Sequence, residues 1–190
     1  LVGSLEGSGS IKRVPRKMVK TILGTRKQVT EQLKVYANAA KTRAILRNSN
    51  VGLMANMNEA MWSTYIDNYD LFTKIGPEIH YLPYSDYGIE IENLTDQEVK
   101  EYADELTSKY KMMDDVEYDK FIGCVKATLG IKKLAEKNNI DCYVYNDIDQ
   151  ATFKTAGCRA GFYPQWFNEN VSVLVPEADI GAGIITYVLK

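Results

Sequence analysis

Histidine is nearly absent from this sequence, with His80 as the single example among 190 residues. One histidine cannot build a multi-histidine metal site, so any metal chemistry must rest on Asp and Glu or on residues outside the chain. His80 falls inside the predicted strand EIHYLP, and we interpret it as a structural residue. The composition therefore excludes the metal sites that are built mainly from histidine.

Cysteine is also sparse, because the chain has only Cys124, Cys142 and Cys158, widely spaced and odd in number. Zinc sites use close pairs of ligands, so we expect none here. Reduced thiols fit a cytoplasmic protein.

No apolar run approaches the ~20 residues that span a bilayer, and LVGSLEGSGS lacks the features of a signal peptide. A net charge of −2 favours neither nucleic acid nor an anionic membrane as partner.

Phosphate-binding loops are missing as well. GSLEGSGS, near the start, follows no strand and lacks the Lys-Ser/Thr ending of a P-loop. The GAG at 181–183 lacks the third glycine of a dinucleotide fingerprint and follows an acidic residue. We therefore predict no nucleotide-binding site.

Apolar periodicity and turn residues predict alternating helices and strands. Thr95 and Glu98 have the spacing of a capping box, which marks the start of a helix. We predict helices over 25–47, 59–76 (ending at Gly76), 95–110 and 118–138 and from Asp179, and strands over 51–55, 78–83, 141–145 and 171–175. This order predicts a Rossmann-like open α/β fold, with a mostly parallel sheet and helices on both faces.

We expect residues 1–24 to form an irregular entry segment or linker and 25–190 to form one α/β domain. The chain starts without methionine and ends in IITYVLK, inside a predicted helix with no stop residue. We therefore expect it to be a piece of a longer polypeptide.

Glu177 is the strongest candidate for a functional carboxylate. In open α/β sheets, ligands bind beyond the carboxyl ends of the strands. Pro176 ends the last strand because it cannot donate a ladder hydrogen bond, and Asp179 is placed to cap the next helix. Glu177 is left without a structural role, so we predict that it is functional; the alternative is that it is a solvated turn residue. The small residues Gly181–Gly183 allow the start of the helix to approach a ligand or another backbone closely.

Met57 and Asn146 follow the strands over 51–55 and 141–145, so we expect both to face the same crevice as Glu177 and to contact substrate. The aromatic stretch GFYPQWFNE at 161–169 precedes a strand instead. It should lie at the opposite end of the sheet, as a packing loop or interface and not as a sugar platform.

Three segments resemble the L-fucose and L-arabinose isomerase-like family, and the resemblance covers most of the chain after Val29. VPEADIGAGI resembles the Glu-x-Asp segment where a strand ends in a glutamate and a helix of small residues follows. KATLGIKKLAEKNNIDCYVYND resembles the long helix and following strand, and VGLMANMNEAMWSTYIDNYDLFTKIGPEIHYLPYSD resembles the opening of the central domain. Pro176 and Ala178 depart from the residues expected beside the glutamate.

The resemblance implies a metal-dependent isomerase that interconverts an aldose and a ketose through an enediol. A divalent ion, usually Mn²⁺, would be held by two acidic residues and histidine, and Glu177 matches the first ligand and catalytic glutamate. The other ligands would come from a C-terminal domain, and an N-terminal domain would precede this central one. We also expect a homo-oligomer in the longer parent protein, and we expect the chain alone to be inactive.

Two other functions fit the same pattern. The first is a non-catalytic sugar-binding or regulatory α/β module of the periplasmic-binding type, which would hold sugar without metal. The second is a flavodoxin-like or receiver domain. Such a domain needs a phosphate-binding loop or an acidic cluster directly after its first strand. NMNE, after the first strand, offers a single acid.

Overall fold

A computed structural model describes residues 6–7, 9–11, 13, 20–54, 56–170 and 172–190. Part of the predicted linker, together with Ala55 and Val171 at the ends of two predicted strands, lies outside the described residues. The chain divides into two compact units, residues 1–42 and 43–190. Within the described ranges, no helix is both long and apolar enough to cross a bilayer.

Helix α2 (Arg26–Arg47) confirms the first predicted helix. Its start is fixed locally, because the Thr25 backbone N–H donates to Gln28 Oε1 over 2.9 Å and Thr25 Oγ1 accepts from the Gln28 N–H over 3.4 Å. This exchange is the capping-box pattern. The helix contains no buried residue.

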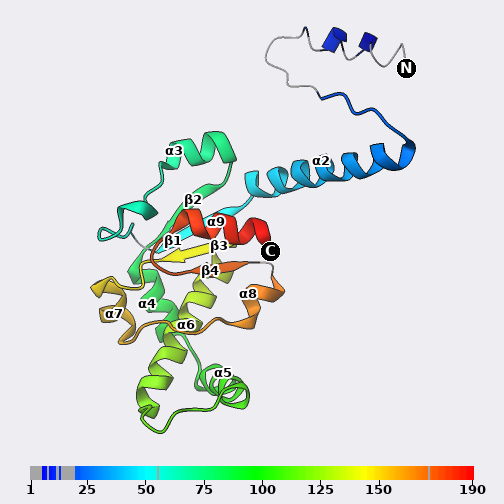
Figure 1. The fold of residues 1–190 in the computed structure, drawn as a ribbon. Coiled ribbons are helices and arrows are strands. Elements are labelled where there is room, and N and C mark those ends of the chain that lie inside the picture. Colours follow the sequence, from blue (N-terminus) through cyan, green and yellow to red (C-terminus); the bar gives the residue numbers. More distant parts are fainter. Residues whose placement is uncertain (1–5, 8, 12, 14–19, 55, 171) are drawn as a thin grey trace. The chain divides into compact units, whose positions relative to one another are not determined.

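Four parallel strands form the sheet of the larger unit (Figure 1). They are β1 (Asn50–Met54), β2 (Glu78–Leu82), β3 (Cys142–Tyr145) and β4 (Val173–Val175), in the order β2-β1-β3-β4. The register sets Gly52 opposite both His80 and Tyr143. The predicted Rossmann-like open α/β fold is therefore confirmed.

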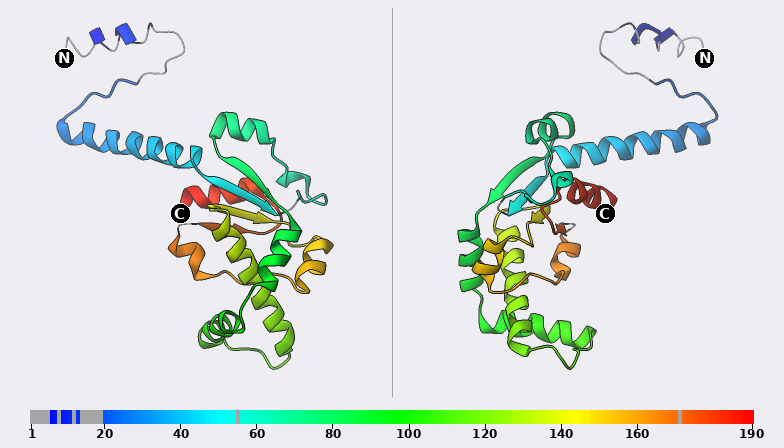
Figure 2. Two further views of the ribbon diagram at one scale, coloured as in Figure 1. Left: turned by 180° about the vertical axis from the view of Figure 1, so that it is seen from behind. Right: turned by 60° about the vertical axis from the view of Figure 1, so that its left-hand side comes forward.

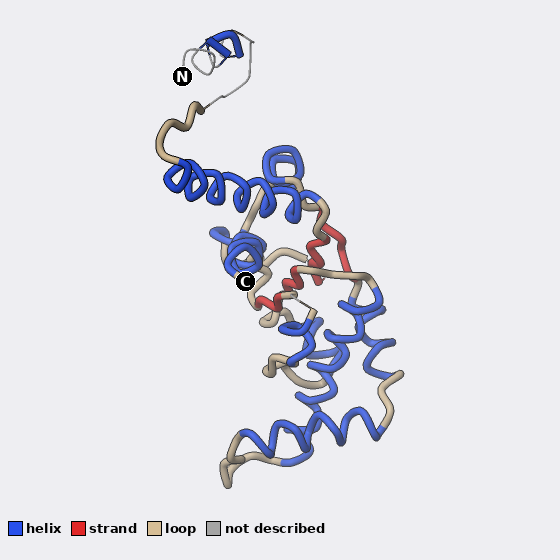
Figure 3. Tube along the Cα trace, turned by 90° about the vertical axis from the view of Figure 1, so that its right-hand side faces the viewer, coloured by secondary structure: helices blue, strands red, loops and turns tan. Residues whose placement is uncertain are grey.

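Helices cover both faces of this sheet, as Figure 3 shows. On one face, α4 (Tyr84–Glu92) and α6 (Tyr118–Lys137) pack over a core that includes Met54, Tyr87 and Tyr143. On the other face, α9 (Ile180–Leu189) and the π-helical turn η2 (Leu71–Ile75) enclose a second core around Leu53, Val144 and Ile184. Burial on both faces explains why the central strands β1 and β3 are nearly continuous apolar runs, whereas the edge strand β2 is only partly buried.

Helix α5 (Asp96–Lys109) packs against the first half of α6, and these parts extend beyond the sheet (Figure 2). The predicted capping box is confirmed, since Thr95 Oγ1 accepts from the Glu98 N–H and the Glu98 carboxylate accepts from the Thr95 N–H. Lys133 of α6 lies 2.8 Å from the Glu98 carboxylate. Its hydrogen bond, together with those from the Thr95 N–H and hydroxyl, lowers the pKa of Glu98 to about 2.

The predicted helix over 59–76 is wrong in its first half. The structure has the short turns η1 (Trp62–Thr64) and α3 (Asn68–Asp70) before η2. Asp67 starts a new helix, because its Oδ1 accepts from the Asp70 N–H over 2.8 Å. Gly76 does end the helical segment, with φ 122°, and a Cβ there would lie 2.4 Å from Arg47 Cγ.

Between residues 84 and 169, the sequence analysis did not predict three short helices: α4, α7 (Gln150–Ala156) and α8 (Gln165–Glu169). Helix α8 occupies the end of the aromatic stretch, where Phe167 is fully buried. Phe162 of the same stretch packs edge-on against Phe121 of α6, with ring centroids 5.8 Å apart. The packing role expected for 161–169 therefore holds.

Candidate functional site

The sheet order creates a topological switch point between its two central strands. The chain leaves β1 toward β2 on one side and leaves β3 toward β4 on the other. Because all strands are parallel, the segments after β1 and β3 meet at the carboxyl edge. Ligand sites of open α/β sheets occur at such a crevice.

Two buried amide side chains, in the segments after β1 and β3, each have one polar atom without a partner among the described residues. Asn58, four residues beyond β1, is 1% exposed, and its Nδ2 has no hydrogen-bond partner among the described residues. Asn146, directly after β3, is 4% exposed, and its Oδ1 is also unpaired there. Most buried polar atoms in proteins are paired, and each unpaired one costs about 1–3 kcal/mol. Each of these atoms therefore has a vacant hydrogen bond that a ligand could fill.

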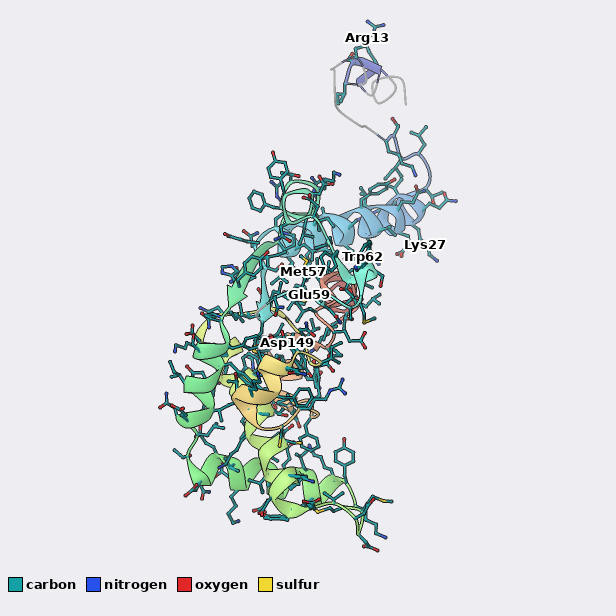
Figure 4. The ribbon with its side chains drawn as sticks, turned by 90° about the vertical axis from the view of Figure 1, so that its left-hand side faces the viewer. Arg13, Lys27, Met57, Glu59, Trp62 and Asp149 are labelled. Atoms are coloured by element: carbon teal, nitrogen blue, oxygen red, sulfur yellow. The ribbon has the colours of Figure 1, made fainter. Side chains whose placement is uncertain are left out.

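A polar network fixes the loop after β3. Tyr84 Oη lies 3.0 Å from Asp149 Oδ2 and 3.2 Å from Asn56 Oδ1, which links three segments of this edge. Thr152 Oγ1 donates to the Asn146 carbonyl over 2.9 Å. Figure 4 labels Asp149, from the segment after β3, and Met57 and Glu59, from the segment after β1.

Asp147 ties the end of β3 to the turn after β4. Its side chain is 1% exposed and forms an ion pair with Arg159. Its Oδ1 accepts from the Glu177 N–H over 2.8 Å, and the Ala178 N–H donates to the Tyr145 carbonyl over 2.8 Å. Buried charges need such pairing, so Asp147 acts by positioning the turn that carries Glu177.

Glu177 is exposed, and its carboxylate has no hydrogen-bond or ion-pair partner in the described part of the chain. Its backbone has φ 63°, and Ala178 follows at φ 55°. The left-handed region costs a non-glycine residue about 1–2 kcal/mol. Asp179 caps α9 as predicted, since its Oδ1 accepts from the Ala182 N–H over 2.8 Å.

The structure places the three predicted site residues after the carboxyl ends of three parallel strands. Glu177 follows β4, and Asn146 follows β3. Met57 follows β1, but its half-buried side chain packs against the core on the α9 face. The substrate roles of Met57 and Asn146 and the catalytic role of Glu177 stay predictions.

Sequence reasoning missed Asn58, Asp147 and Asp149 as site residues. Their positions directly after predicted strands were a usable signal. Which side chain turns inward depends, however, on loop conformation. Asp147 is tied to Glu177, 30 residues further along the chain, and no local pattern encodes that contact.

The donors do not form a complete metal centre. Within the described ranges, no group of three His, Cys, Asp or Glu side chains could hold an ion. Glu177 offers one free carboxylate, whereas His80 lies inside β2 with its Nε2 buried and unpaired among the described residues.

No protein-family model matches this chain, and no curated protein sequence matches it.

Proposed function

We propose that this chain provides the sugar-binding face of an aldose–ketose isomerase of the L-fucose and L-arabinose type. The observation that carries the proposal is the two unpaired buried amide atoms in the segments after β1 and β3, Asn58 Nδ2 and Asn146 Oδ1. One amide atom is a donor and the other an acceptor. A sugar hydroxyl can satisfy either, because it both donates and accepts.

The charge at this edge favours a neutral ligand. Asp147, Asp149 and Glu177 all lie in segments that follow β3 or β4. Only Asp147 has an ion-pair partner in the described part of the chain. Asp149 accepts hydrogen bonds from Tyr84 and from the Ala151 N–H, but neither its carboxylate nor that of Glu177 is neutralised by a cationic side chain among the described residues. These two negative charges would repel a phosphate or a carboxylate ligand, so an uncharged polyol fits this edge better than an anion does.

The unpaired Glu177 carboxylate supplies the chemistry of the proposed reaction. It takes the proton from C2 of the aldose and returns it to C1, while the hydroxyl proton moves from O2 to O1. The aldose becomes a ketose through an enediol, without net oxidation. Because the described residues do not form a metal centre, we assign no step to an ion.

The proposal requires the remaining acidic ligand and a histidine from outside this chain, as the family resemblance implies. We also propose a cytoplasmic location, because Cys124, Cys142 and Cys158 are all free thiols.

The second candidate is a non-catalytic sugar-binding module. It is favoured by the incomplete set of metal donors.

Asn146→Ala should weaken the binding of L-fucose and L-arabinose by about tenfold, the equivalent of one hydrogen bond. It should leave the melting temperature unchanged or raise it, because alanine removes a buried amide oxygen that is unpaired without ligand. Binding is measured by ligand-observed NMR and stability by calorimetry.

Asn168→Ala is the matched control, since this exposed amide of α8 precedes β4 at the other edge of the sheet. The control should keep its sugar affinity. Absence of sugar binding by the unmodified chain, or equal affinities in both variants, would remove the basis for the proposed site.

Glu177→Gln separates the isomerase from the binding module. For an isomerase site, adding Mn²⁺ to a longer polypeptide that supplies the missing ligands should tighten L-fucose binding by about tenfold, and Glu177→Gln in that polypeptide should abolish this gain without unfolding it. Calorimetric titrations with and without Mn²⁺ measure both effects. If Mn²⁺ changes the sugar affinity of neither the unmodified protein nor Glu177→Gln, the non-catalytic module is favoured.

A further inference from the structure

A concave surface lies away from the residues of the carboxyl edge. It is a groove of about 910 Å³ between the end of α5, the connection over 110–117 and the segment over 161–169. That segment leads into β4, so this part of the lining lies toward the amino end of that strand. Ligand pockets in proteins typically have about 300–1,000 Å³.

Apolar side chains line most of this groove. They come from α5, from the connection after it, from α6 and from the aromatic stretch: Leu106, Met112, Met113, Phe121 and Phe162. Met113 is 68% exposed. Methionine adapts its shape to apolar ligands because its side chain is unbranched and flexible.

Tyr102 of α5 places one polar group in this lining. It is 7% exposed, and its Oη has no hydrogen-bond partner among the described residues. Burial raises the pKa of Tyr102, so the hydroxyl stays protonated and acts as a donor. A buried donor without a partner points to an acceptor on a molecule that the chain itself does not supply.

The charged residues of the lining balance one another. Glu105 and Lys109 form an ion pair at 2.7 Å. Lys111 and Glu169, which also line the groove, carry opposite charges, and Glu169 accepts a hydrogen bond from Gln165. The groove therefore has no net charge with which to select an ion of either sign.

We propose that this groove binds a neutral, largely apolar small molecule with a carbonyl or ether oxygen that accepts a hydrogen bond from Tyr102 Oη. A small molecule fits better than a second copy of the chain, because the unpaired hydroxyl is buried within a concave surface. The inference is independent of the sugar site, since the two share no residue.

Nile red, a neutral aromatic dye with a ring carbonyl, is the probe for this groove. Its fluorescence should rise to saturation with one molecule bound per chain. Tyr102→Phe should weaken binding by about tenfold, the effect of one hydrogen bond, without loss of folding, because it removes an unpaired hydroxyl. Met113→Lys, at an exposed position of the lining, should abolish saturable binding.

Tyr69→Phe is the control, since this tyrosine is 76% exposed and lies in α3, outside the groove. It should bind the dye like the unmodified chain. Equal affinities in Tyr102→Phe and the control would overturn the proposal, as would the absence of saturable binding. Sedimentation showing a dimer that Met113→Lys dissociates would also overturn it, because a second copy would then cover the groove.

Discussion

Asp147→Ala is expected to lower the free energy of unfolding by about 2–3 kcal/mol and to abolish sugar binding. The substitution removes the carboxylate that accepts from the Glu177 N–H over 2.8 Å. Hydrogen bonds to a charged group are the stronger ones, and the turn after β4 would lose its tie to β3. Arg159, whose side chain is 54% exposed, can turn to solvent and adds little to the loss.

Urea unfolding measures the stability change, since the midpoint falls in proportion to the lost free energy. Asp147→Asn should lose less, because its amide oxygen can still accept from Glu177. Asp115→Ala, an exposed residue of the connection before α6, serves as the surface control. If Asp147→Ala unfolds at the same urea concentration as this control, Asp147 does not hold the turn.

Gly183→Val is expected to destabilise the chain by about 3 kcal/mol, at the upper end of the usual cost of overpacking. A Cβ at Gly183 would lie 2.6 Å from Cys142 Sγ and 2.8 Å from Val144 Cγ1. Both atoms belong to β3, which is hydrogen-bonded on both sides and cannot easily retreat. Helix α9 would have to move away from the sheet and open the core around Ile184.

Gly181→Ala is a matched control in the same helix. Its Cβ would meet only Asp179 Oδ1, at 3.3 Å. Alanine is the better helix former by about 0.5–1 kcal/mol, so this variant should be as stable as the unmodified chain or more so. Thermal and urea unfolding of both variants check the pair, and equal stabilities would contradict close packing of α9 on β3.

The sequence could predict those features of the fold that depend on interactions between residues close together in the chain. Thr95 and Glu98 meet within one turn, Gly76 needs its positive φ, and Asp179 caps the helix that follows it. Each of these features depends on residues a few positions apart. Helix α4 was missed because it follows Pro83 and contains Gly88, a combination that favours a turn.

The candidate site was only partly predictable for the same reason. Glu177 and Asn146 could be placed at one edge from the alternation of strands and helices alone. The unpaired state of Asn58 and Asn146 depends on how two loops fold over the switch point. The strand order and the contact between Asp147 and Glu177 are tertiary features, and no period in the sequence encodes them.

The pairing of β1 with β3 has a consequence for how fast the chain folds. The Asn50 N–H donates to the Asp141 carboxylate over 2.8 Å, across 91 residues of sequence, and the register continues from Val51 opposite Cys142. Contacts this distant form only after a long loop has closed, so parallel sheets fold slowly. Until β3 docks, the apolar edge of β1 stays open, and the nascent chain is exposed to aggregation during that interval.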